Sequence, residues 1–272
     1  MAPMSRKMPL TDFRAVRTVL EAEDFVYAPG PAERPVNDLI TETTWSHLQT
    51  LPETVSIFTS NDHGRDLSLL SELWAIWVNS IPNDGSVVHH AMLVATDEFQ
   101  AATFNSLHGF YRVSVACLRA ALEQMTIGVD CELRADKVEQ ELWLEGKGEL
   151  LFGRACDTLQ RQFLRTGLRQ LFQQDDGKHK PGWLRALHDA LSDYAHARPG
   201  FEALQLWEGS NGPIYVKSAF LWNVKMWLFT YVSCIFLVKI VGRSNTRPAL
   251  ILADPRIAEI VQLKSIADFL WP

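Results

Sequence analysis

Apolar residues along most of this chain recur at the three- and four-residue spacing of an α-helix. From residue 66 onward, the pattern is carried by Leu67, Leu70, Leu73, Trp74 and Trp77. This spacing places apolar side chains on one face of a helix. Turn residues divide the rest of the chain, and we expect further helices over residues 86–107, 109–132, 135–144, 149–173, 183–197, 216–241 and 254–269.

Two of these helices have clear start signals. Ser86 follows the turn sequence Pro-Asn-Asp-Gly at residues 82–85, and Asp254 precedes Pro255. Serine and aspartate cap helix N-termini, and proline is favoured at the first helical position. The chain contains neither GxGxxG nor GxxxxGK[ST], so a Rossmann or P-loop fold is not supported. The predicted fold is an all-α multi-helix bundle.

The N-terminal part has a mixed pattern. A short helix is expected near residues 11–23, and a proline-rich loop follows at residues 29–35. The segment Val-Ser-Ile-Phe-Thr at residues 55–59 is ambiguous, because its composition also fits a short strand. We therefore expect a mixed N-terminal segment at residues 1–62, packed on a helical bundle domain at residues 63–272.

Composition places the chain among ordinary globular proteins. Of its 272 residues, 47% are hydrophobic and 21% are charged, which excludes a disordered or collagen-like chain. A net charge of -6 argues against a protein devoted to coating nucleic acid. The four cysteines form no CxxC pair and no secretory signal is apparent, so we expect a cytoplasmic protein with reduced cysteines. Neither a metal site nor a cofactor is predicted.

One segment requires a test against a membrane span. Residues 226–238 form an uncharged apolar run of 13 residues between Lys225 and Lys239. At about 1.5 Å per residue, this run reaches about 20 Å, which is short of a hydrocarbon core of about 30 Å. A buried helix is therefore the favoured interpretation, and no membrane span is expected.

A polar stripe is predicted on the helix at residues 109–128. Arg112, Arg119 and Glu123 are seven and four residues apart, so they share one narrow stripe on an otherwise apolar helix. Arg119 and Glu123 can pair across one turn. One interpretation is a buried network that fixes the helix register. The other is a pair of arginines that holds an anion such as phosphate in a cleft.

A second polar stripe is predicted on the helix at residues 183–197. Arg185, Asp189, Ser192 and His196 fall on one face, and Asp193 borders them. A carboxylate near an imidazole can orient it for proton transfer. The alternative is a solvated helix face, and His188 is interpreted as a packing residue between the two faces.

A third, basic stripe follows the helix predicted at residues 149–173. Arg154, Arg161, Arg165 and Arg169 lie along one side of it. Such a stripe is typical of a nucleic-acid track or of a solvated face. Because exposed aromatic residues are not interleaved and Asp157 can pair with Arg161, the solvated face is favoured.

Three segments together resemble a bacterial helical group, the HEPN-like and abortive-infection-type proteins. They are Leu-Arg-Ala-Ala-Leu-Glu at residues 118–123, Leu-Ser-Asp-Tyr-Ala-His at residues 191–196, and Ser-Asn-Gly-Pro-Ile-Tyr-Val at residues 210–216. The resemblance implies a helical bundle that is often dimeric. In active members it also implies metal-free RNA cleavage by an arginine and a histidine, for which Arg119 and His196 are the nearest matches. Active members carry both residues close together on one helix, whereas here they lie on different predicted helices.

Two functions stay open at this point. The first is an intracellular bacterial binding or interaction protein of HEPN-like type, in phage defence or a toxin–antitoxin-like system. The second is a metal-independent endoribonuclease, with His196 as general acid or base and Arg119 and Arg112 stabilising the phosphate. Either function allows for a homodimer and for an RNA or protein partner. The predicted cluster comprises Arg112, Arg119, Glu123, Ser192, Asp193 and His196, with Asn211 nearby.

Overall fold

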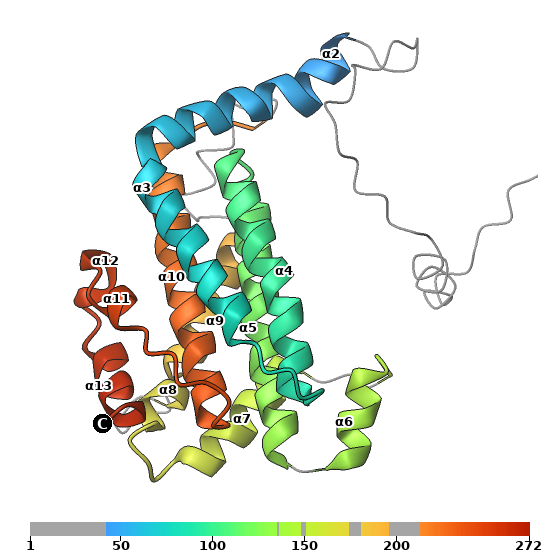
Figure 1. Ribbon diagram of the computed structural model, residues 1–272, viewed down its shortest axis with the longest axis vertical. Helices are drawn as coiled ribbons and strands as arrows, with labels where there is room; N and C mark the ends of the chain where they lie inside the picture. The colour runs from blue at the N-terminus through green and yellow to red at the C-terminus, as the bar shows by residue number, and fades with distance from the viewer. Residues whose placement is uncertain (1–41, 135, 148–150, 174–180, 196–212) are drawn as a thin grey trace, which may run out of the picture. The chain divides into compact units, whose positions relative to one another are not determined.

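A computed structural model describes residues 42–134, 136–147, 151–173, 181–195 and 213–272 (Figure 1). Residues 42–272 form one compact unit. Its described residues build helices and no strand, with a single isolated bridge between Gln173 and Pro181. The predicted all-α multi-helix fold is confirmed.

The chain enters this unit through a continuous run of helix. The short helix α2, Glu42–Trp45, leads into the π-helical turn η1, Ser46–Thr50, and then into α3, Leu51–Ser80. The segment at residues 55–59 is therefore helical, and the strand alternative is wrong. Helix α3 also passes through the expected boundary at residue 62, and it bends at His63. Val55 and Thr59, four residues apart, are both buried, as expected for residues on one face of a helix.

Helices α4, Val87–Leu107, and α5, Tyr111–Arg134, lie side by side as a hairpin (Figure 1). The Ser86 side chain accepts a hydrogen bond from the backbone of His89, which confirms the predicted cap. Gly109 makes the turn with φ of +83°. A side chain there would also meet the carbonyl oxygen of Ile214 at 2.5 Å, so the turn requires glycine.

The helix predicted at residues 149–173 is broken. The structure has α7, Phe152–Phe163, and a separate short α8, Arg169–Phe172. At the break, the Thr166 hydroxyl donates to the Phe163 carbonyl and accepts from the backbone of Leu168, in place of helical bonds. Gly167 lies directly against the Phe269 ring and leaves no room for a side chain. Before α7, the predicted helix α6, Lys137–Leu144, is capped by Asp136.

Helix α10, Lys217–Ile240, runs through the core beside α5 and α9, Trp183–Ala195. Trp227 and Tyr231 of α10 pack with Phe99 of α4 and Trp77 of α3 in one aromatic cluster. Among the described residues, α10 alone is long and apolar enough to cross a membrane, and 83% of its most apolar stretch is buried inside the protein.

The C-terminal helix is also shorter than predicted. Asp254 caps α12, Pro255–Ala258, as expected, but the chain then leaves the helical conformation at Ile260 before α13, Val261–Leu270. A further short helix, α11, Ala249–Leu252, precedes them. The interruption lets Ile257 and Leu263 both pack into the core. Six residues apart on one uninterrupted helix, they would point in different directions.

Candidate functional site

The predicted ion pair on α5 is present and is joined by a histidine from α9. Arg119 Nε donates to Glu123 Oε1 at 2.7 Å, and His188 Nε2 lies 2.8 Å from the same oxygen. Burial opposes ionisation of Glu123. The hydrogen bonds from His188 and Arg119 outweigh burial and hold the pKa of Glu123 below its usual value. One carboxylate therefore links the two helices.

The imidazole of His188 is also held by an aromatic ring. The Phe152 ring of α7 stacks on it, with centroids 4.1 Å apart and planes 14° apart. His188 Nδ1 lies 3.7 Å from Asp189 Oδ1, which is beyond hydrogen-bond range. Stacking and the Glu123 bond together fix the ring, so its orientation is set by the fold.

These residues line a cleft of about 510 Å³ between α5, α7 and α9. Arg185 of α9 also lines the cleft. Its guanidinium donates to the Gly153 carbonyl at 3.0 Å and pairs with Asp157 of α7. The members of the cleft that carry ionisable side chains are Arg119, Glu123, Arg185, His188 and Asp189. Arg119 and Glu123 are 28% and 27% exposed, so their pair is partly open to the cleft rather than sealed in the core.

Arg112 shares the α5 stripe but contacts α9 elsewhere. It is exposed, and its Nη2 donates to the carbonyl oxygen of Ala195 at 3.0 Å. A cation at the carbonyl end of a helix is favoured by the helix dipole. Arg112 therefore caps α9, next to a smaller pocket of about 370 Å³ that Phe110, Val113 and Ala116 help to line.

The other predicted site residues are not brought into the cleft. Ser192 is buried and does not line the cleft, and its hydroxyl has no hydrogen-bond partner among the described residues. Asp193 is partly exposed and does not line the cleft. His196 and Asn211 lie outside the residues that the structure describes.

Sequence reasoning missed His188, which was interpreted as a packing residue. The signal was present in the helical spacing. His188 lies three residues after Arg185 and four before Ser192, positions that neighbour one another on a helix surface. However, the carboxylate that contacts His188 is Glu123 of α5, and residue spacing within α9 cannot predict a contact with another helix.

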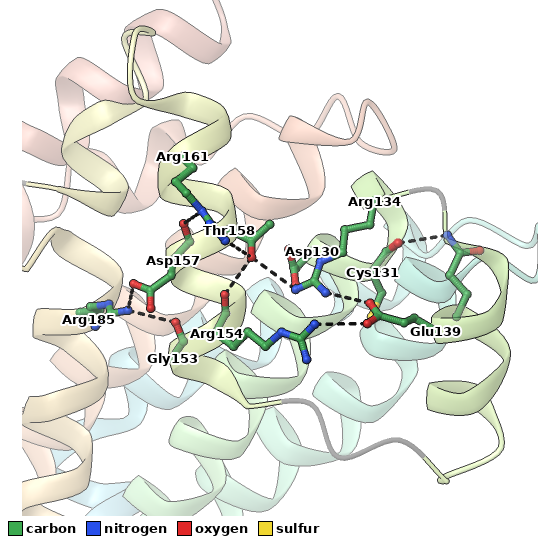
Figure 2. Close-up of polar contacts among 11 residues, drawn as sticks. Asp130, Cys131, Arg134, Glu139, Gly153, Arg154, Asp157, Thr158, Arg161 and Arg185 are labelled. Atoms are coloured by element: carbon green, nitrogen blue, oxygen red, sulfur yellow. Dashed lines mark hydrogen bonds and ion pairs between the residues drawn. The ribbon is translucent and has the colours of Figure 1, made fainter.

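A second polar network joins α5, α6 and α7 (Figure 2). Arg134 pairs with Asp130 on its own helix and with Glu139 of α6 at 2.7 Å, and Glu139 also binds Arg154 of α7 at 3.3 Å. Burial raises the pKa of Asp130, although Arg134 counteracts it. Because Figure 2 shows Arg154 directed toward Glu139, part of the basic stripe has a structural role.

The pairing predicted between Asp157 and Arg161 takes a different form. Arg161 Nε donates to the backbone carbonyl of Asp157 at 3.3 Å, whereas the Asp157 carboxylate faces Arg185 (Figure 2). Asp157 therefore connects the α7 network to the cleft.

Metal-binding and thiol chemistry find little support in the described part of the chain. It contains no group of three histidine, cysteine, aspartate or glutamate side chains placed to hold a metal ion. The four cysteines are unpaired. Burial, followed by the charge of Glu98, raises the pKa of Cys117 to about 12, so this half-buried thiol stays protonated at neutral pH.

Comparisons with protein-family models, with curated proteins and with solved structures found no match to this chain.

Proposed function

We propose that this protein is a helical binding protein of HEPN-like type, acting in phage defence or a toxin–antitoxin-like system, and that the cleft holds an anionic group of its ligand. The observation that carries this proposal is that Arg119 of α5 and Arg185 of α9 reach one cleft around His188. Guanidinium groups bind phosphate and carboxylate oxygens through paired hydrogen bonds.

An anionic group of a ligand can replace the carboxylate that pairs with Arg185. Arg185 faces Asp157, whose side chain is 61% exposed. An exposed ion pair contributes about 0–1 kcal/mol, so a ligand phosphate can replace this carboxylate at little cost.

Calorimetric titration with inorganic phosphate and pyrophosphate tests this proposal. Arg185→Gln is expected to weaken binding at least about tenfold, because a charge-assisted hydrogen bond contributes about 1.5–3 kcal/mol. Arg65→Gln, which removes an exposed arginine of α3 outside the cleft, is the matched control and keeps wild-type affinity. Absence of binding to the wild type, or equal affinity of Arg185→Gln, contradicts the proposal.

A metal-independent endoribonuclease is the second candidate, and one hydrogen bond favours it. Because the Glu123 carboxylate accepts from His188 Nε2, the neutral imidazole keeps its lone pair on Nδ1. A carboxylate-oriented imidazole is suited to act as a general base, with Arg185 and Arg119 near a developing phosphate charge. The role assigned to His196 stays a prediction.

Incubation with a mixed RNA pool in EDTA distinguishes the candidates. If His188 is the base, His188→Gln lowers cleavage by at least about 100-fold, the usual contribution of general acid–base catalysis. His196→Ala runs beside it. Loss of cleavage in His196→Ala alone assigns the base to His196, and no cleavage by the wild type refutes the enzyme.

A further inference from the structure

The cleft around His188 also has an apolar part. Besides the ionisable side chains and Gly153, it is lined by four apolar residues, which are Ile127, Leu151, Phe152 and Pro181. Leu151 is 63% exposed, and Pro181 is exposed as well. Apolar side chains that line a cleft and face water gain free energy when a ligand covers them with an apolar group of its own.

The lining of the cleft changes from charged to apolar along α5. Arg119, Glu123 and Ile127 follow one another at four-residue spacing, so they lie on one face of the helix. The eight residues from Arg119 to Ile127 correspond to a rise of about 12 Å. The guanidinium of Arg119 therefore belongs to one end of the cleft, and Ile127 belongs to the other.

The segment before α9 adds an apolar residue at the same end. Helix α9 runs antiparallel to α5, because its last residue, Ala195, contacts Arg112 in the first turn of α5, whereas His188 contacts Glu123 farther along α5. Pro181 lies just before α9, so it falls toward the end of the cleft at which α5 carries its apolar residue.

Helix α7 places apolar side chains beside a cation of the cleft. Leu151 is the N-cap of α7, and Phe152 is its first residue. Figure 2 shows Arg185 of α9 directed to the same turn, where its guanidinium donates to the Gly153 carbonyl at 3.0 Å. An anion bound by Arg185 therefore has apolar surface next to it.

The charges and the size of the cleft favour a small ligand with one anionic group. Among the described residues that line it, the two arginines are matched by two carboxylates, those of Glu123 and Asp189. Such a lining does not suit a polyanion, whose binding depends on an excess of cations. The volume of about 510 Å³ is far more than one inorganic ion fills, and it lies within the range of about 300–1,000 Å³ that is typical of sites for small organic molecules.

We propose that the ligand of this cleft is a small organic phosphate, in which one phosphate group is joined to a compact apolar group. The inference rests on the proposed function, because it assigns the phosphate to Arg119 and Arg185. Phosphate has enough oxygens to accept hydrogen bonds from both guanidinium groups. The apolar group binds to Ile127, Leu151, Phe152 and Pro181.

Calorimetric titration of the full chain with two phosphate esters tests this inference. Phenyl phosphate carries an aromatic ring, glycerol phosphate carries a polar group, and both are fully ionised at about pH 8. Full burial of an aromatic side chain corresponds to about 10- to 150-fold in affinity. Because the cleft is partly open, we expect phenyl phosphate to bind about tenfold more tightly than glycerol phosphate. Its binding should also have the more negative heat-capacity change, which marks burial of apolar surface.

Leu151→Ser removes one exposed apolar side chain from the cleft. Serine is favoured at an N-cap, so the variant is expected to retain α7. The preference for phenyl phosphate over glycerol phosphate should fall about fourfold, which is the contribution of about one buried methylene group. Leu250→Ser is the matched control, because it changes a leucine of α11 that is 66% exposed and lies outside the cleft, and it should keep the wild-type preference.

The outcomes separate this inference from the proposed function. If inorganic phosphate binds and depends on Arg185, but phenyl phosphate binds no more tightly than glycerol phosphate, the inference is wrong and the proposed function stands. A preference that is unchanged in Leu151→Ser overturns the inference too. Binding of phenyl phosphate that is unaffected by Arg185→Gln also overturns it, because the ligand then lies elsewhere. If none of the phosphates binds, both the inference and the proposed function are wrong.

Discussion

Replacement of Arg134 by methionine probes the network that joins α5, α6 and α7. The Asp130 side chain is 3% exposed; its Oδ2 pairs with Arg134, and its Oδ1 has no partner among the described residues. Methionine fills much of the volume of the arginine stem and removes the charge. The variant therefore leaves a buried carboxylate without its cation.

The expected loss is large and depends on pH. Removing one partner of a buried ion pair costs about 3–5 kcal/mol, and we expect about 3 kcal/mol for Arg134→Met because Arg134 is partly exposed. With an unfolding slope of about 3 kcal/mol per molar urea, the midpoint falls by about 1 M. Burial already raises the pKa of Asp130, and loss of Arg134 raises it further.

The sign of the pH effect follows from this raised pKa. A carboxyl whose pKa is higher in the folded state than in the unfolded state destabilises the fold as the pH rises through the raised value. The penalty of Arg134→Met should therefore be smaller at an acidic pH than at neutral pH, because protonation removes the unpaired charge of Asp130. Urea unfolding followed by circular dichroism at both pH values measures it. An unchanged midpoint, an equal penalty at both pH values, or failure of Asp130→Asn to rescue Arg134→Met refutes the reasoning.

Two further predictions concern the core. Gly128→Ala places a methyl group 2.6 Å from the Ala91 Cβ where α5 crosses α4, so we expect a loss of about 1–3 kcal/mol in urea unfolding, restored by Ala91→Gly. Tyr231→Phe removes a buried hydroxyl that has no hydrogen-bond partner among the described residues, so the melting temperature should stay unchanged or rise. A decrease of more than about 1 kcal/mol in the free energy of unfolding contradicts this expectation.

Local spacing predicted the helices because each buries one apolar face, and it failed where tertiary contacts end a helix. The sequence around Gly167 continues the helical pattern, yet α7 ends at Phe163. After this end, the ring of Phe269, more than a hundred residues later in the chain, occupies the space beside Gly167. Such a contact leaves no trace in the periodicity of α7.

Local spacing predicted one part of the candidate site and not the other. The pair of Arg119 and Glu123 follows from their four-residue spacing, and the structure confirms it. The choice of histidine required knowledge of how α5 and α9 pack. Helical spacing placed His196 on the polar face of the helix predicted at residues 183–197 and His188 between its two faces, and only the packing of α5 on α9 shows that His188 meets Glu123.

The exposed position of the α5 stripe follows from the hydrophobicity of α10. A helix that is apolar on every side belongs in the centre of a bundle, and α10 is buried along most of its length. Helix α5 therefore packs its apolar side on α4 and α10 and turns Arg119 and Glu123 toward α7 and α9, near the surface. A partly exposed ion pair contributes little to fixing helix register. The same packing leaves Arg119, Arg185 and His188 on the wall of a partly exposed cleft, which is where the proposed binding function places the anion of the ligand.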